Sequence, residues 1–371
     1  MSKPSIQFRD LFTKLADPRL DRHKLHPLHE ILTVALCAML AGAENFNDFA
    51  RFGRDKETWL KTFLPLVHGI PSHDTFNRVF QLLKPAAFLD CFMRWTQRLR
   101  RAVRQEIVAL DGKALRHALN TGQSLPYIVS AWASSNRLVL GQLQVADKSN
   151  EITALPLLLR QLELAGCIVT VDAMGCQKKI ATEIKAARAD YVMALKGNHE
   201  HIHAAVKTFL DDAVAGRATQ VASYQTVEQD HGRSEVRRWY LSDQLDWLAE
   251  RAEWAGLRTV GMVESVRQVG NQPPTTERRY FLASIGKDVR AFARATREHW
   301  GVENPVHWIL DVHFGEDDSR ARTGHAPENL ATLRRLTLNL LRQDKSQRGS
   351  LRGQRKSAGW NDNYLLQLLG F

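Results

Sequence analysis

Cysteine is scarce in this chain, and its placement argues against a zinc ribbon. The 371 residues contain four cysteines, and no two of them form a Cys-x-x-Cys pair. Structural zinc sites of that kind are usually built from such pairs. The sequence therefore predicts ordinary buried thiols in a reducing cytosol, at Cys37, Cys91, Cys167 and Cys176.

Long hydrophobic runs are also missing. The longest uncharged apolar stretch extends from Ile31 to Ala43, whereas a membrane-spanning helix needs about 20 apolar residues. Arg9 and Asp10 interrupt the first segment before an apolar core forms, which argues against a signal peptide. No internal repeat is present. We expect a cytoplasmic protein without a membrane segment.

Positive charge is abundant. The formal net charge is +11 and the hydrophobic content is 44%, enough for two or three domains with real cores. An excess of positive charge predicts a polyanionic partner, and DNA is the first candidate. A basic ribosomal protein or a membrane-surface protein is the competing explanation.

The pattern of residues divides the chain into five segments. Residues 1–104 predict an all-helical N-terminal domain, in which Ser72 caps a helix after Pro71. This domain is either a helix-turn-helix that contacts DNA ends or a plain helical bundle. Residues 200–286 predict a β-rich, basic insertion. Residues 287–342 are helical, and residues 343–371 form a basic, Ser- and Gly-rich tail that we expect to be mobile.

Residues 105–199 predict the first part of an α/β catalytic core. Three short β-like runs, with Asn136 in the turn between the second and third, precede two helix-linked runs. This order is that of a ribonuclease H-like sheet, and a generic α/β domain is the alternative.

Two aspartates follow apolar runs in this core. Asp111 follows the apolar run in EIVALDGK, where Gly112 would allow a sharp turn. Asp172 follows the apolar run in CIVTVDAMG. The first and fourth strands are neighbours in a ribonuclease H-like sheet, so both carboxylates should meet at one edge. Two carboxylates held that close repel each other, and a divalent cation relieves the repulsion. Such oxygen ligands suit Mg²⁺.

A third acid, Glu303, lies in REHWGVENPVHW, where His299, Glu303 and His307 are spaced four residues apart. Asn304-Pro305 argues against one smooth helix and predicts that Asn304 caps a new one. A zinc site is therefore disfavoured, and both histidines are expected to contact DNA or to lie in polar surroundings near the acids. Trp300 and Trp308 are predicted to be packing residues.

Several cations are candidate DNA contacts. Lys113 follows Asp111 closely and Lys196 follows the last core strand. Arg233 and Arg237 alternate with Glu235 along one predicted strand face, which could bind phosphates. The competing interpretations are a solvated lysine for Lys113 and an ion-paired solvent face for the arginines.

The motifs ALDGK, TVDAMGCQKKIA, ADYVMALKGNHE, HGRSEVR and REHWGVENPVHWILDVHFGEDDSR together resemble the insertion-sequence DDE transposases, in particular the H-repeat-associated branch. FRDLFTKLADPRLDRHKLHPLHEIL and GIPSHDTFNRVF resemble that branch's associated N-terminal domain. The resemblance covers about residues 8–342. It implies a ribonuclease H-like core interrupted by a β-rich insertion, with Asp111, Asp172 and Glu303 as the catalytic and metal-binding triad.

This chain lacks a motif found in many related transposases, which carry Tyr-x2-Arg-x3-Glu-x6-Lys around the glutamate. Here the positions of the Tyr, Arg and Lys are occupied by Thr296, His299 and Leu310. The roles of the Tyr, Arg and Lys are therefore not carried over.

The sequence thus predicts a DNA transposase. Two Mg²⁺ ions, with Mn²⁺ as a substitute, would serve hydrolysis at the element's ends and transfer of the 3′-hydroxyl into target DNA. The partners would be terminal inverted repeats and target DNA, bound by a homodimer. The alternatives are a nuclease of the same fold without strand transfer and an inactive DNA-binding relic.

Overall fold

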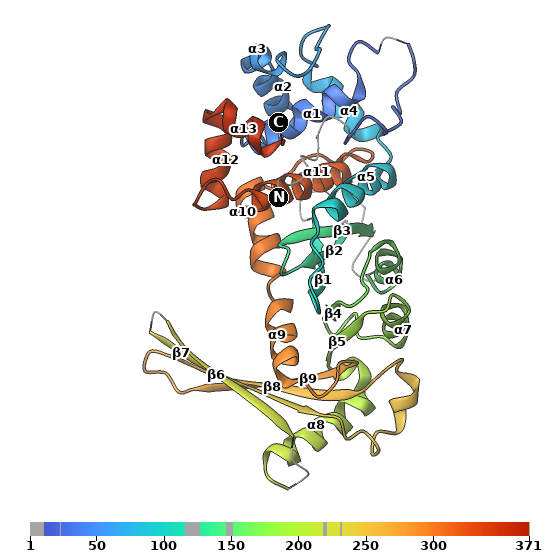
Figure 1. Cartoon of the computed structure of the whole chain (residues 1–371), viewed down its shortest axis with the longest axis vertical. Helices are drawn as coiled ribbons and strands as arrows, with labels where there is room; N and C mark the ends of the chain where they lie inside the picture. Colours follow the sequence, from blue (N-terminus) through green and yellow to red (C-terminus); the bar gives the residue numbers. More distant parts are fainter. Residues whose placement is uncertain are drawn as a thin grey trace.

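The computed structural model describes residues 11–22, 24–115, 127–145, 151–217, 221–230 and 232–370. The molecule is elongated (Figure 1). A helical layer stands at one end, a mixed sheet with helices on its faces lies in the middle, and a long β arm leaves the other end. Within the described part of the chain, no helix is long and apolar enough to cross a membrane. All four cysteines are buried and free, as predicted.

The helical layer begins with five helices. Ser72 caps the fourth by accepting a hydrogen bond from the Thr75 N–H, which confirms the predicted helix start. The first helix is buried along almost its whole length, because its residues are apolar on every side. The five are α1 (Leu28–Leu40), α2 (Phe46–Asp55), α3 (Glu57–Leu60), α4 (His73–Leu82) and α5 (Pro85–Leu99).

The core sheet has the predicted ribonuclease H-like order, β3-β2-β1-β4-β5. The first three strands form an antiparallel meander, with Asn136 in its second turn, and β4 then pairs parallel to β1. The strands are β1 (Ile107–Ala114), β2 (Tyr127–Ala133), β3 (Leu138–Val145), β4 (Ile168–Val171) and β5 (Asp190–Leu195).

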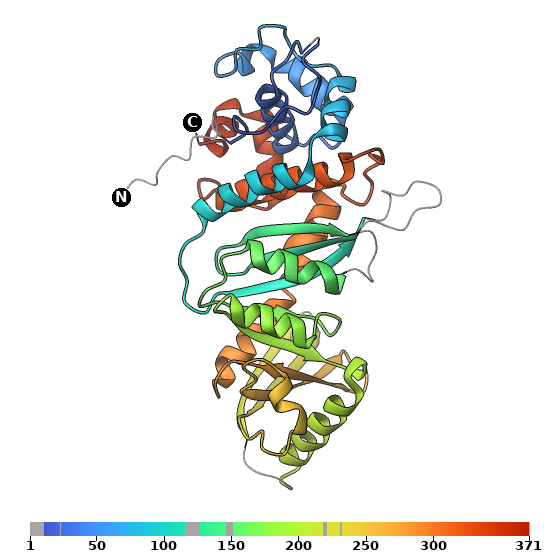
Figure 2. The same ribbon diagram turned by 90° about the vertical axis from the view of Figure 1, so that its right-hand side faces the viewer.

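Helices cover both faces of this sheet (Figure 2). On one face α6 (Glu151–Gln161) and α7 (Lys178–Ala186) pack against the strands in one apolar cluster. On the other face α9 (Val289–His299) packs against β1, β4 and β5 through Phe292 and its neighbours. The strands are buried on both faces, which explains why their sequences read as continuous apolar runs.

The β-rich insertion continues the core sheet instead of forming a separate one. After α8 (Glu200–Val214), its last strand pairs antiparallel to β5, and the nine strands lie in the order β3-β2-β1-β4-β5-β9-β8-β7-β6. The far ends of these strands form the arm in Figure 1. The strands are β6 (Ala222–Asp230), β7 (Arg233–Ser242), β8 (Thr259–Val269) and β9 (Thr275–Ala283).

The chain then returns through α9 to the helical layer. A π-helical turn (Glu303–Trp308) leads into α10 (Ile309–Phe314), and α11 (Ala326–Gln343) packs into the same apolar core as α1, α4 and α5. The helices at the two ends of the sequence therefore share one core.

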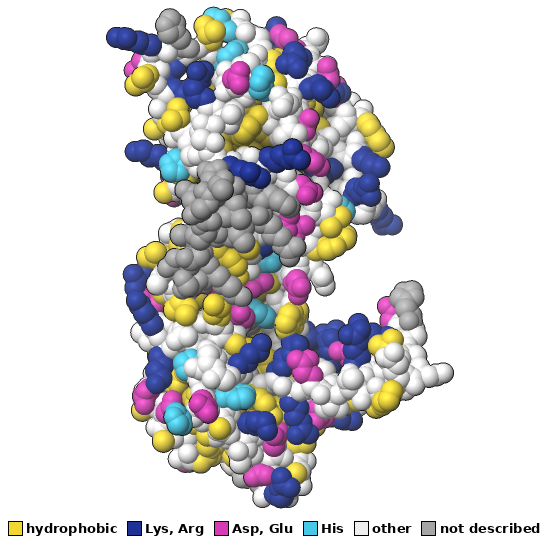
Figure 3. Space-filling view, turned by 180° about the vertical axis from the view of Figure 1, so that it is seen from behind, with side chains coloured by type: hydrophobic (Ala, Val, Ile, Leu, Met, Phe, Trp, Pro, Cys, Tyr) yellow, Lys and Arg dark blue, Asp and Glu magenta, His cyan; other side chains and the backbone are white. Residues whose placement is uncertain are grey.

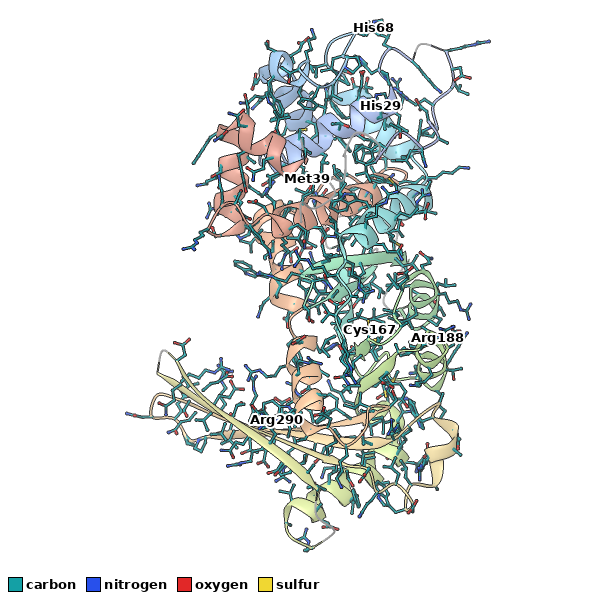
Figure 4. All side chains as sticks on the ribbon, in the orientation of Figure 1. His29, Met39, His68, Cys167, Arg188 and Arg290 are labelled. Atoms are coloured by element: carbon teal, nitrogen blue, oxygen red, sulfur yellow. The ribbon has the colours of Figure 1, made fainter. Side chains whose placement is uncertain are left out.

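The tail predicted to be mobile is folded. It forms α12 (Leu351–Trp360) and α13 (Asp362–Leu368), which bury Ala358, Leu365 and Leu368 against the helical layer. Arg355 donates to the carbonyl oxygen of Met39 at 3.0 Å. Figure 4 labels Met39 in the helical layer. The prediction was wrong because the few apolar residues of the tail pack against α1 and α11, which are distant in sequence or belong to another segment.

Candidate active site

Asp111 and Asp172 lie side by side on neighbouring parallel strands. Leu110 of β1 is the register partner of Val171 of β4, and each aspartate is the next residue of its chain. Adjacent strands are about 4.8 Å apart, and residues that follow a register pair point to the same side. The sheet order therefore brings the two carboxylates together across 61 residues of sequence.

The strand that carries Asp111 does not end there, contrary to the predicted sharp turn at Gly112. β1 continues to Ala114, because β2 pairs with it beyond the point where β4 stops. Gly112 serves packing instead. A Cβ at this position would lie 2.1 Å from a ring carbon of Tyr127, so the tyrosine ring occupies the space of the missing side chain.

The carboxylate of Asp172 is fixed by the turn that follows β4. Its Oδ1 accepts hydrogen bonds from the N–H groups of Met174 and Gly175, each at 3.0 Å. A Cβ at Gly175 would come within 3.1 Å of both Leu155 and Val171, so a larger residue here would push these side chains outward by a few tenths of an ångström. Charge-assisted bonds of this kind orient one oxygen of the carboxylate before any ligand arrives.

Glu303 opens the π-helical turn after α9 has ended at His299. The break in the helix was predicted, but the predicted cap was wrong. Residue Val302 precedes the turn without a side-chain cap, and its carbonyl accepts from the N–H groups of Val306 and His307. Pro305 is tolerated because it lies in the first turn, where an N–H has no helical partner.

One pocket of about 230 Å³ is lined by Asp111, Asp172 and Glu303. Three acids from distant parts of the chain thus face one space at the carboxyl ends of the parallel strands, where open α/β sheets bind ligands. Lys196, one of the predicted DNA contacts, lines the same pocket and is exposed.

The two histidines lie beside the aspartates. His299 Nδ1 is 2.9 Å from the hydroxyl of Thr170, and His307 Nδ1 is 3.5 Å from Asp111 Oδ2. Burial lowers the pKa of His299 to about 4, although the charge of Asp172 opposes it. Burial, reinforced by the charges of Arg335 and Lys113, lowers the pKa of His307 to about 3. Both rings are therefore neutral near pH 7. His307 is only 8% exposed, which favours the second of its two predicted roles, as part of the polar surroundings of the acids.

Lys113 was expected to meet a phosphate, and the structure gives it other partners. Its side chain is only 10% exposed, and its ammonium group lies 3.3 Å from Glu316 and 3.1 Å from Asp317, with Asp311 closer still. Glu316 and Asp317, which lie in the turn after α10, thus supply acids that surround a buried lysine.

A second, larger hollow of about 390 Å³ adjoins the pocket on the arm. We call it the arginine groove, and it is lined by Arg233, Arg237, Arg267, Arg279 and Arg297 together with Trp300. The groove and the pocket share Glu277, Arg279 and Trp300, so the two are continuous. Figure 3 shows Lys and Arg side chains gathered where the arm leaves the body.

The arginines of the arm strand are ion-paired, and they also face the groove. Arg233 and Arg237 line the groove, yet both also pair with the buried Glu235, with Arg237 Nε at 2.6 Å from its Oε1. Sequence reasoning missed Arg267 and Arg279. Strand alternation could have indicated them, because β8 and β9 are paired with each other and place alternate residues on the same face as β7.

The tryptophans predicted to be packing residues are exposed. Trp300 and Trp308 are each 52% exposed, and the Arg279 guanidinium lies 4.6 Å from the Trp300 ring centroid.

The residues at the Tyr and Lys positions of the related motif have packing roles. Thr296 accepts a hydrogen bond from Trp239 Nε1 at 2.9 Å, and Leu310 is fully buried.

Comparison with known proteins agrees with this architecture. Residues 104–340 match the family described as Transposase DDE domain, and residues 9–96 match the domain described as DDE_Tnp_1-associated. The chain is 36% identical over 350 residues to "H repeat-associated putative transposase YhhI" of Escherichia coli strain K12, covering 93% of this chain and 92% of that protein.

Two further relatives extend the comparison. "Putative transposase YncI" of Escherichia coli O157:H7 is 36% identical over 365 residues, covering 97% of this chain and 93% of that protein. "Uncharacterized protein in dhlA 3'region" of Xanthobacter autotrophicus is 44% identical over 286 residues, covering 76% of this chain and 95% of that protein. With two matched domains and relatives that align over nearly its whole length, the chain belongs to the DDE transposase family.

Proposed function

We propose that this protein is a DNA transposase that hydrolyses a phosphodiester at each end of a mobile element and joins the freed 3′-hydroxyl to target DNA. The observation that carries this proposal is the single pocket lined by Asp111, Asp172 and Glu303. Family membership implies a nuclease or transferase activity in general, and the joining step is the specific part that we add.

Membership of the family also implies dependence on a divalent metal ion. We propose two Mg²⁺ ions, replaceable by Mn²⁺, held by Asp111, Asp172 and Glu303. Such ions, when bound, would activate the attacking oxygen and neutralise charge at the phosphate. The all-oxygen donor set fits Mg²⁺.

The three acids would hold a metal ion partly through water molecules. Within the described residues, no three His, Cys, Asp or Glu side chains lie close enough together to form a ready-made metal site. Mg²⁺ does not need one, because it keeps several waters and binds through one or two carboxylates. The protein's own contribution is to hold the acids still, through the β1–β4 pairing and the N–H groups that orient Asp172.

The arginine groove supports DNA as the partner. Guanidinium groups bind phosphate oxygens in a fork geometry, and the groove leads directly into the pocket of the acids. We propose that it holds the sugar–phosphate backbone of the terminal inverted repeat or of target DNA, with exposed Lys196 near the reacting phosphate. We also propose a homodimer on DNA, because two element ends need two sites, and a location in the bacterial cytoplasm, on the nucleoid when bound.

The proposal is tested with the purified full-length chain, Mg²⁺, a target plasmid, and linear DNA whose ends carry inverted repeats identified by sequencing the DNA on both sides of the gene. We expect nicks at the repeat ends and a joined product of higher mass on a denaturing gel. Cleavage without any joined product would replace this function by that of a nuclease of the same fold. An absence of cleavage in both Mg²⁺ and Mn²⁺ would identify an inactive relic.

Arg267→Ala tests the groove, because this arginine lines it and lies on the exposed part of β8. Removing one phosphate contact releases one fewer counterion, so the slope of log affinity against log salt should become less steep by about 1. Fluorescence anisotropy of labelled repeat DNA between low and moderate salt measures this slope.

Arg94→Ala is the matched control, because Arg94 is an exposed arginine on α5 in the helical layer. It should leave the slope unchanged. Equal slopes for wild type and Arg267→Ala would show that DNA does not run along the groove.

A further inference from the structure

A buried ion pair joins the helical layer to the end of β1. Glu316 and Arg335 both have fully buried side chains, and Arg335 Nη1 donates to Glu316 Oε1 at 2.7 Å. The other carboxylate oxygen of Glu316, Oε2, lies 3.3 Å from Lys113 Nζ. A single carboxylate therefore bridges α11 and the strand that carries Asp111.

Two residues near Asp111 contact this ion pair: Lys113 on the same strand and Ser130 on the neighbouring strand. Along β1, Lys113 lies two residues beyond Asp111 and so points to the same face of the sheet. Across the ladder, Ser130 of β2 is the register partner of Asp111, and Arg335 Nε is 3.4 Å from the Ser130 hydroxyl. Shifting the pair would thus displace the backbone on two sides of the catalytic position.

Stability alone does not account for such a pair. Desolvation of two charges offsets much of their attraction, and apolar residues of similar volume are often as stable or more stable in the same place. Glu316 is buried beside the cations Arg335 and Lys113. Burial alone would raise its pKa, but the charges of these cations lower it to about 2. It is therefore a fixed charge, held by Arg335 and Lys113 together.

We propose that Glu316 is a positioning residue for Asp111, acting through Arg335 and Lys113 to hold the end of β1 in the geometry that binds the divalent ion. This inference rests on the proposed function, in which Asp111 is a metal ligand. Residues that orient metal ligands typically change metal affinity by about 10- to 100-fold when replaced.

The test uses full-length protein without DNA, and it measures Mn²⁺ binding from the loss of the free Mn²⁺ signal in electron paramagnetic resonance. Glu316→Gln alone leaves the Arg335 charge buried without its partner and can unfold the chain. The double variant Glu316→Gln/Arg335→Met removes both charges and keeps the core filled. We expect it to melt cooperatively and to bind Mn²⁺ at least about tenfold more weakly than wild type.

Thr332→Val is the matched control, because Thr332 is buried on the same helix but accepts its hydrogen bond from Gln142 of β3. It should bind Mn²⁺ as wild type does. Binding by the double variant at wild-type affinity would overturn the positioning role and leave Glu316 as a core residue.

Asp111→Asn separates this inference from the proposed function. If Asp111→Asn weakens Mn²⁺ binding while the double variant does not, only the positioning role fails. If Asp111→Asn binds Mn²⁺ as tightly as wild type, the proposed metal site itself is wrong.

Discussion

Asp172→Asn is expected to lower the rate of DNA cleavage at repeat ends by at least about a thousandfold, the scale on which loss of one preorganised charged group acts. The substitution removes the negative charge and keeps the shape. An asparagine carbonyl oxygen can still accept from the N–H groups of Met174 and Gly175, which hold the aspartate at 3.0 Å. The loss should therefore appear in cleavage rate and not in folding, as measured by single-turnover cleavage and thermal melting.

The same loss is expected for Asp111→Asn and Glu303→Gln, because all three acids line one pocket. Asp190→Asn is the control. Asp190 is the first residue of β5, at the opposite end of the strand from the pocket, where it pairs with Lys185 at 2.7 Å and accepts a hydrogen bond from Ser284. Its replacement should leave the cleavage rate within about twofold of wild type, as for a position away from the site. Wild-type cleavage by Asp172→Asn would show that the acids have been assigned wrongly.

Leu365→Ala is expected to destabilise the protein by about 2–5 kcal/mol, the usual cost of a large-to-small change in a packed core. Leu365 is fully buried in the cluster that α13 shares with α1 and α11. Because helices from both ends of the sequence meet there, the helical layer should unfold at a lower temperature and at a lower denaturant concentration. Circular dichroism during urea unfolding measures the change.

Trp360→Ala provides the comparison within the same segment. Trp360 is 78% exposed at the end of α12, and its loss should change the free energy of unfolding by no more than about 0.5 kcal/mol. If Leu365→Ala were equally mild, α12 and α13 would not be part of the helical layer's core.

The part of the fold that could be predicted from sequence is the part governed by local patterns. Apolar runs of strand length separated by helices gave the order of β1 to β5, and that order was enough to place Asp111 beside Asp172. Ser72 before a helical pattern is a signal that lies within a few residues of the helix that it caps. The β-rich character of the insertion followed from the same alternation.

The parts that failed depend on partners far away in sequence. Lys113 resembles a surface lysine until α10 and the residues after it bring three acids to it. The tail looks unstructured until α1 offers an apolar surface for it. Trp300 looks like a core residue, but the break after His299 turns it outward to the groove. These contacts join residues that are far apart in the chain, and therefore they could not be predicted from composition and spacing.

The continuous sheet has a mechanical consequence. β9 is hydrogen-bonded to β5, and β5 to β4, whose end carries Asp172. An arm joined to the body by a flexible linker could swing, whereas an arm joined by a strand ladder can move only by breaking backbone hydrogen bonds or by slight changes of twist. The distance from the groove to the acids is therefore set by the ladder, and any large adjustment between them during the reaction falls to the DNA.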